Sequence, residues 1–245
     1  MFKKLLLIGL LTIATLQGMD ERLFKYPDAK NDYVKATQDK DQSAAFDLAL
    51  FYKTTLHDNE KAIEWYKKSY EYGSSRAALN IGNIYKHFDK TKEAIEWYKK
   101  AYDRGDIKSA LALGIIYEQT LHNYKVAIKW YEKAYKIGNM TGANNLGYLY
   151  KVELNDINSG IKWYKRAAAG GHANAINNLG RTYHDLKDEV VSSSYILAMV
   201  NYGYTKKQVL DFLKNERKID RGTLEKAYKL QLTLDIPKHY TGGID

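Results

Sequence analysis

The sequence predicts an all-α protein built as an αα-hairpin solenoid with a C-terminal helical cap. Two observations predict this fold. The 245-residue chain repeats one pattern every 32 or 33 residues, and its four tryptophans occupy equivalent positions in successive copies. It also contains only two prolines, which leaves long helices uninterrupted. One hairpin cannot bury its own apolar faces, so neighbouring copies must stack to form the core.

The first segment, residues 1–18, has the form of a secretory signal peptide. A Met-Phe-Lys-Lys start precedes an apolar run from Leu5 to Leu16 that is interrupted by one glycine and two threonines. The run is shorter than the roughly 20 residues that span a membrane. We expect cleavage near Gly18 and export to the bacterial periplasm or beyond, with no transmembrane span. An uncleaved anchor and a buried N-terminal helix are the alternatives.

The chain is basic, with a net charge of +9 that falls to +7 if the two lysines of residues 1–18 are removed. A basic surface can attract nucleic acid, anionic lipid or an acidic protein. The basic residues are dispersed in short pairs and export is expected, so we interpret them as a solvated surface and expect no nucleic-acid partner. Because the chain has no cysteine, it cannot form disulfides, a thiolate nucleophile or a Cys-ligated metal site.

Residues 19–42 are expected to hold a linker and a half-repeat, and the linker from Met19 to Asp32 is expected to be polar and poorly ordered. The half-repeat is indicated by Tyr33 and Ala36, which fall in the columns that Tyr66 and Ser69 occupy in the first complete repeat.

Residues 43–204 hold about five repeats, each with two helical patterns. The first pattern places a small residue and tyrosine on one helix face, as in Ala77, Ile81, Gly82 and Tyr85. Its copies occupy residues 44–52, 77–85, 109–117, 142–150 and 175–183. Copies of the second pattern occupy residues 61–73, 93–105, 126–138, 159–171 and, in degenerate form, 191–203. The tryptophans belong to this second pattern and are Trp65, Trp97, Trp130 and Trp163.

A glycine follows each copy of the second pattern, where a left-handed residue commonly ends a helix. These glycines are Gly73, Gly105, Gly138, Gly171 and Gly203. The next residue in the first three copies is Ser74, Asp106 or Asn139, each of which is a good N-cap for the following helix.

Residues 205–245 break the period and are expected to cap the solenoid. Thr205 and Gln208 form a capping box ahead of an apolar segment, and a last helix is expected from about Asp220. The tail from Pro237 is expected to be loose, including its Gly-rich Tyr240–Gly243 segment, which opens no helix.

The repeat pattern resembles the Sel1-like repeat, a relative of the tetratricopeptide repeat, over about two thirds of the chain. The resemblance rests on Leu-Gly-x-x-Tyr, as at 146–150, and Ala-x-x-Trp-Tyr-x-x-Ala, as at 94–101, followed by glycine. It implies a right-handed superhelix of antiparallel helix pairs and a role as an adaptor that binds proteins or peptides. The chain lacks about three loop residues of the usual repeat, which alters the loop and keeps both helices.

In the related tetratricopeptide geometry, the first helix of each pair lines a concave groove. Carried over position by position, the predicted groove residues are Ser43, Phe46, Leu50, Lys53, Arg76, Leu79, Asn83, Lys86, Lys108, Leu111, Ile115, Glu118, Thr141, Asn144, Tyr148, Lys151, Asn174, Asn177, Arg181 and His184. The N-terminal part is apolar with basic edges and the C-terminal part is rich in asparagine.

This division suggests a peptide whose apolar anchors lie near Leu79 and Ile115. Its polar or acidic end would then meet Asn144, Asn177 and Arg181, since amide and guanidinium groups bind directionally. The alternative is that these side chains are merely solvated.

The tryptophan and tyrosine columns are interpreted as core, and Trp97→Ala is predicted to cost roughly 3–5 kcal/mol. No metal, cofactor or catalytic site is expected. His57 and His122 are equivalent loop positions in different repeats, and no nucleophile or phosphate-loop motif occurs.

We therefore predict an exported, non-catalytic, monomeric scaffold that binds a protein or peptide in its groove. The alternative is a β-lactam or cell-wall hydrolase, implied only by resemblance to a cysteine-rich secreted branch of the family. The absence of cysteine separates this chain from that branch, and turnover of nitrocefin or peptidoglycan would distinguish the two functions.

Overall fold

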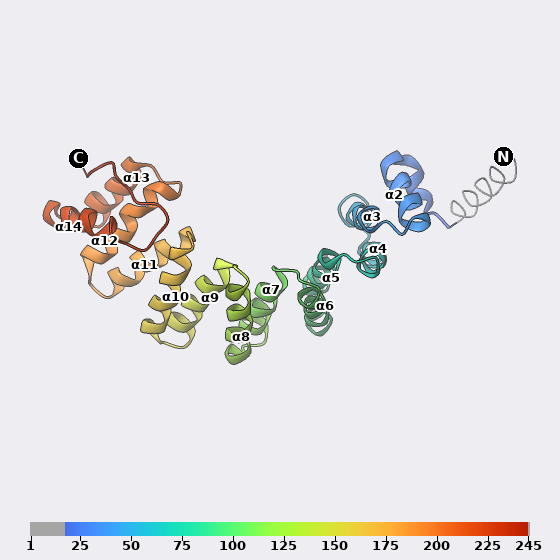
Figure 1. Cartoon of the computed structure of the whole chain (residues 1–245), viewed down its shortest axis with the longest axis horizontal. Helices are drawn as coiled ribbons and strands as arrows, with labels where there is room; N and C mark the ends of the chain where they lie inside the picture. Colours follow the sequence, from blue (N-terminus) through green and yellow to red (C-terminus); the bar gives the residue numbers. More distant parts are fainter. Residues whose placement is uncertain (1–17, 245) are drawn as a thin grey trace, which may run out of the picture. The chain divides into compact units, whose positions relative to one another are not determined.

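The computed structural model describes residues 18–244, which are helical and contain no strand (Figure 1). The predicted signal peptide lies outside the described residues except for Gly18. None of the described helices combines the length and the apolar character that crossing a membrane would need. The chain divides into two compact units, one ending at Leu113 and the other beginning at Gly114.

The first unit is a stack of helices joined by short turns, in which each helix packs on the next. Its elements are η1 (Glu21–Lys25), α2 (Pro27–Gln38), α3 (Gln42–Thr54), α4 (Asn59–Glu71), α5 (Ser75–His87) and α6 (Thr91–Asp103). Helix α7 (Ser109–Ile115) contains the boundary between the units.

The second unit continues the hairpins and ends in the cap. Its elements are η2 (Ile116–Thr120), α8 (Tyr124–Lys136), α9 (Met140–Tyr148), η3 (Leu149–Glu153), α10 (Ile157–Ala169), α11 (Ala173–Asp185), α12 (Glu189–Ala198), η4 (Met199–Tyr202), α13 (Lys206–Asp211), η5 (Phe212–Glu216) and α14 (Arg221–Gln231). Of the short elements, η2, η3 and η5 are π-helical turns. Helices α12 and α14 lie side by side (Figure 1).

The predicted poorly ordered linker is wrong. Residues 21–38 form η1 and α2, with Leu23 fully buried. Arg22 donates to Asp58 at 2.6 Å, and the Tyr52 hydroxyl donates to Asp20 at 3.1 Å, which fixes this segment to the first repeat. A few apolar side chains spaced for one helix face are enough to cover the open end of the stack.

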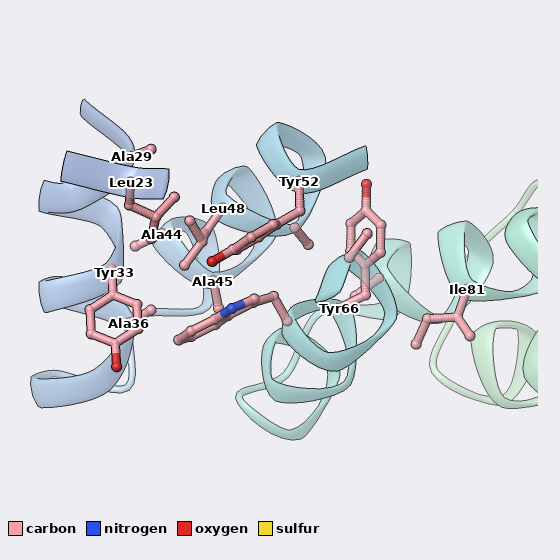
Figure 2. Close-up of a cluster of buried hydrophobic side chains, with 14 of the residues drawn as sticks. Leu23, Ala29, Tyr33, Ala36, Ala44, Ala45, Leu48, Tyr52, Tyr66 and Ile81 are labelled. Atoms are coloured by element: carbon pink, nitrogen blue, oxygen red, sulfur yellow. The ribbon is translucent and has the colours of Figure 1, made fainter. Parts of the chain in front are cut away.

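The core of the first unit includes both residues that indicated the half-repeat. Figure 2 shows Tyr33 of α2 in one cluster with Leu48 and Tyr52 of α3 and Tyr66 of α4. Ala36 is fully buried as well.

The five glycines predicted at helix ends all have left-handed backbones, which confirms the turn. The φ angles are 117° at Gly73, 84° at Gly105, 87° at Gly138, 79° at Gly171 and 102° at Gly203. The predicted caps are confirmed too: the Asp106 carboxylate accepts from the Ser109 amide at 2.9 Å, and Ser74 and Asn139 cap α5 and α9.

The other turn of each repeat is closed by a left-handed residue that is not glycine. This second column consists of His57, Asp89, His122, Asn155 and Lys187, with φ between 49° and 63°. In four repeats the next residue is an aspartate or asparagine whose side chain caps the following helix. This tight turn is how the helices stay paired although the loop is short.

The main core column is tyrosine, not tryptophan. Tyr66, Tyr98, Tyr131 and Tyr164 are each at most 2 % exposed. The Tyr98 ring packs directly on Gly82 of the preceding helix, and Tyr131 and Tyr164 pack in the same way on Gly114 and Gly147. The glycine of the Leu-Gly pair therefore makes room for an aromatic ring.

The prediction that the tryptophan column is core holds fully only for Trp65. The other three rings are partly exposed. A cation three residues on covers each ring: the distance to the ring centre is 4.2 Å for Lys100 over Trp97 and 4.3 Å for Arg166 over Trp163. Trp97, Trp130 and Trp163 thus lie at the edge of the core, where each ring is partly exposed.

The C-terminal cap has the predicted capping box at Thr205 and Gln208, and Asp220 caps α14. The predicted loose tail is wrong. The Gln231 side chain donates to the Tyr240 carbonyl and accepts from the Tyr240 amide at 3.0 Å. Ile236 and Ile244 are also buried, so the tail packs against the cap.

Candidate functional site

The candidate site is the outer side of the first helices, which we call the first-helix face. It consists of the predicted groove positions of α3 and α5 in the first unit, of α7 at the boundary, and of α9 and α11 in the second unit. The opposite side of the same helices is buried, as at Ala77 and Ile81 of α5, so the groove positions point away from the hairpin core.

In the first unit, α3 and α5 contribute one continuous patch. The Arg76 guanidinium of α5 lies 4.9 Å from the ring centre of Phe46 of α3. Phe46 in turn packs edge-on against Tyr66, with ring centres 5.2 Å apart. Of the other predicted residues, Ser43, Leu50, Asn83, Lys86 and Lys108 are exposed, and Lys53, Leu79 and Leu111 are half-buried.

The hydroxyl of the buried Tyr98 contacts a side chain of this face. The Tyr98 hydroxyl donates to the Asn83 carbonyl oxygen at 2.7 Å. Burial raises the pKa of Tyr98 to about 12, so the hydroxyl remains a donor at neutral pH. This bond fixes the Asn83 side chain and leaves its NH₂ group for a partner.

Glu118 departs from the predicted arrangement. It is only 7 % exposed, and its carboxylate accepts a hydrogen bond from Tyr131. Burial raises the pKa of Glu118. The π turn of η2 explains the difference, because the extra residue rotates the following side chains relative to an α-helix. Glu118 is therefore part of the packing, whereas Ile115, before the turn, is half-buried at the face.

In the second unit, α9 and α11 place amides on neighbouring turns. The Asn178 NH₂ group donates to Asn144 at 3.0 Å and ties the two helices together. Asn177 is adjacent in sequence, and Arg181 lies one helical turn further along α11. The structure thus brings Asn144 and the α11 residues onto one patch.

Tyr148 and Arg181 converge on the same patch. Tyr148 is 47 % exposed, and both side chains act electrostatically on the buried Tyr164 beneath them. Burial is the main reason that the pKa of Tyr164 is raised to about 12. The patch therefore combines an exposed aromatic ring, amides and one guanidinium.

Besides Glu118 and Asn144, three predicted residues of this unit have partners within the protein. Lys151 donates to Thr182 at 3.1 Å and pairs with Asp185 at 2.9 Å. His184 Nδ1 lies 2.5 Å from Glu189 of α12, and Thr141 lies 3.4 Å from the His172 ring. These contacts join successive helices and leave Asn174, which is exposed, as the remaining predicted residue of α11.

The α11 end of the face opens into a pocket of about 490 Å³ that the repeat pattern did not predict. Asn177 is one of its lining residues, and the others come from the end of α12, η4 and the cap. The sequence signal was the break of period after Gly203, which we interpreted only as a cap.

Chemically, this surface offers hydrogen-bond donors and acceptors, an aromatic ring and cations. Among residues 18–244, no group of three or more histidine, aspartate or glutamate side chains could hold a metal ion. The arrangement suits recognition of a polypeptide, whose backbone amides match asparagine side chains in pairs.

Comparison with known proteins agrees with the geometry. The Sel1 repeat model matches residues 42–74, 108–139 and 141–172, and a tetratricopeptide repeat model matches residues 75–104. No curated protein matches the chain.

Solved structures with the same fold include the protective antigen c5321 of uropathogenic Escherichia coli, at 24 % identity and a TM-score of 0.60. The match covers 80 % of this chain and 45 % of the antigen, so the chain spans less than half of that protein. A Sel1 repeat protein of Oxalobacter formigenes is 19 % identical, with a TM-score of 0.59 over 86 % of this chain and 96 % of that one.

The C-terminal part of a tetratricopeptide repeat protein of Cytophaga hutchinsonii is also similar. It is 15 % identical, with a TM-score of 0.55 over 88 % of this chain and 93 % of that one. At these identities the structures establish the fold, and the repeat models establish the family. The chain belongs to the Sel1-like repeat proteins of the tetratricopeptide class, whose fold is typical of scaffolds for protein–protein interaction.

Proposed function

We propose that this protein is an exported, non-catalytic scaffold that binds a protein or peptide segment on its first-helix face. The observation that carries the proposal is the patch formed by Asn144, Tyr148, Asn177 and Arg181 in the second unit. The Asn144 amide is held by Asn178 at 3.0 Å, so it is in place before a partner arrives. Preorganised polar groups lose less entropy on binding than flexible ones.

The contrast between constant buried positions and variable surface positions in the repeats supports the same proposal. The buried positions keep nearly the same residue in each copy, as with the four core tyrosines, whereas the first-helix face changes from copy to copy. A surface that varies over a constant core can recognise one partner in a specific register. The partner is proposed to be an extended or helical segment, because consecutive helices present their side chains in a row.

Export is supported by the sequence of residues 1–18. The first described helix, η1, begins at Glu21, so cleavage near Gly18 removes none of the described helices. Sequencing the N-terminus of the protein from its native compartment tests this point, with a mature start near Met19 expected. A mature chain that retained Met1 would contradict cleavage.

Capture of partners from the native compartment tests binding. The test variant combines Asn144→Ala, Asn177→Ala and Arg181→Ala. The control combines Lys129→Ala, Asn158→Ala and Lys162→Ala, which are exposed positions on the second helices.

We expect wild type and control to capture the same partners after crosslinking, and the test variant to lose them while keeping its helical circular dichroism. If the test variant captured every partner of the wild type, the first-helix face would not be the binding surface.

A further inference from the structure

The pocket at the α11 end of the first-helix face has a composition that points to one kind of ligand group. It lies wholly within the second unit, between α11, the end of α12, η4, α13 and η5. Its volume of about 490 Å³ lies in the range of pockets that enclose a small ligand or a long side chain.

One part of the pocket wall is apolar. It is formed by Ile196, Met199, Val209 and Phe212, the first three of which are at most 8 % exposed. Tyr204 and Gln208 also line the pocket. Because the apolar side chains are packed into the cap, this part of the wall is rigid. Such a wall suits the aliphatic stem of a long side chain, which gains by leaving water.

The rim carries two carboxylates, Asp211 and Glu216, and no cation lines the pocket. Neither carboxylate forms an ion pair within residues 18–244, and both side chains are exposed. The chain as a whole has 38 lysines and arginines against 29 acidic residues, so an acidic rim is a local departure from the basic surface.

The nearby cations are directed elsewhere. Lys206 donates to the Gly242 carbonyl at 3.1 Å and Lys214 to the Ile244 carbonyl at 3.0 Å, so both are held by the C-terminal tail. The Arg217 guanidinium lies 5.2 Å from the Phe212 ring centre and does not line the pocket. Lys206 and Lys214 thus contact the tail, whereas Asp211 and Glu216 line the pocket.

We propose that this pocket binds a lysine or arginine side chain of the polypeptide held on the first-helix face. The proposal rests on the proposed function, because Asn177 belongs both to the face and to the pocket lining. The stem would lie between Met199 and Phe212 and the cation would reach the two carboxylates. An uncharged apolar group would instead cover these carboxylates without pairing them, which is costly. The residue at this end of the ligand is therefore basic, not acidic.

The direct test titrates ¹⁵N-labelled protein with Nα-acetyl-lysine amide and Nα-acetyl-arginine amide and follows backbone NMR shifts. Nα-acetyl-norleucine amide is the matched probe, because it keeps an aliphatic stem and lacks the charge. We expect the lysine and arginine amides to shift resonances around Val209 and Phe212, and to bind at least roughly fivefold more tightly than norleucine amide. Equal or tighter binding of norleucine amide, or the absence of shifts at the pocket with the basic probes, would overturn the proposal.

The variant Asp211→Asn/Glu216→Gln should lose the preference for the charged probes. Its matched control is Glu71→Gln/Asp103→Asn, which neutralises two exposed acids of the first unit and should keep the preference. If the pocket variant retained this preference, Asp211 and Glu216 would not be the groups that recognise the charge.

The same pocket variant in the capture experiment separates this proposal from the proposed function. If wild type captures a partner and the pocket variant captures it equally well, the pocket is unused and the scaffold function stands. If wild type captures nothing while the basic probes bind the pocket as predicted, the scaffold function fails and the pocket chemistry stands.

Discussion

Replacing Gly82 with alanine tests the packing that joins the two helices of a repeat. Gly82 lies inside α5, where alanine alone should stabilise the helix by about 1 kcal/mol, because glycine loses more backbone entropy on folding. The Tyr98 ring opposes this gain. A Cβ atom at position 82 would lie 2.6 Å from two carbons of that ring, so the ring would have to move.

The ring has little room to move. Tyr98 is 1 % exposed, and its hydroxyl is held by Asn83 at 2.7 Å. Forcing an extra methyl group into a packed site costs about 1–3 kcal/mol, and straining the hydrogen bond costs about 1 kcal/mol more. After the helix gain is subtracted, we predict that Gly82→Ala destabilises the protein by about 2 kcal/mol.

Urea unfolding followed by circular dichroism measures this change. The control is the same substitution combined with Tyr98→Leu, compared with Tyr98→Leu alone. With the ring removed, alanine at position 82 should be neutral or stabilising, so the two substitutions should be strongly coupled. If Gly82→Ala instead stabilised the protein by about 1 kcal/mol with Tyr98 present, the ring would not be packed on Gly82 and the reasoning would fail.

Three further predictions concern single positions, and urea unfolding measures each of them. Trp97→Ala should cost about 2–3 kcal/mol, less than for a fully buried tryptophan, because one side of the ring is open; a loss below about 1 kcal/mol would show that the ring is not packed. His122→Gly should stabilise the protein by about 0.5–1 kcal/mol, because its φ of 49° strains a side-chain-bearing residue; a destabilised variant would contradict this. Glu118→Gln should stabilise the protein at pH 7. Burial raises the pKa of Glu118, so its ionisation opposes folding above the ordinary glutamate pKa of about 4.3, and the gain should vanish near pH 4. A less stable variant at pH 7 would contradict it.

The helical hairpins and their glycine turns followed from the sequence because they repeat. A left-handed residue after each second helix is required by the turn itself, and all five glycines occupy it. The second turn was missed because its residues differ in type: histidine, aspartate, asparagine and lysine share only their position before the next helix cap. This column of left-handed residues can be recognised from its period of 32 or 33 residues together with the Asp or Asn helix cap that follows most of its members.

The candidate site could be predicted only in part, because side-chain direction depends on local helix geometry. Ideal helical spacing placed Glu118 with Ile115 on the open face, and one π turn rotates Glu118 into the core. Similarly, tryptophan and tyrosine are consecutive residues of one motif, and spacing alone does not show which of the two is nearer the centre of the core. The cap pocket depends on packing between residues of the non-repeating segment, for which the repeat offers no template.

Binding on the first-helix face is tested most directly by site-specific photocrosslinking in the native compartment. A photoreactive amino acid at position 144 lies on the first-helix face of α9, and one at position 129 lies on the exposed side of the second helix α8. We expect a crosslinked partner from position 144 and none of that partner from position 129. Crosslinking of the partner from position 129 alone would contradict binding on the first-helix face, because it would place the partner on the second helices.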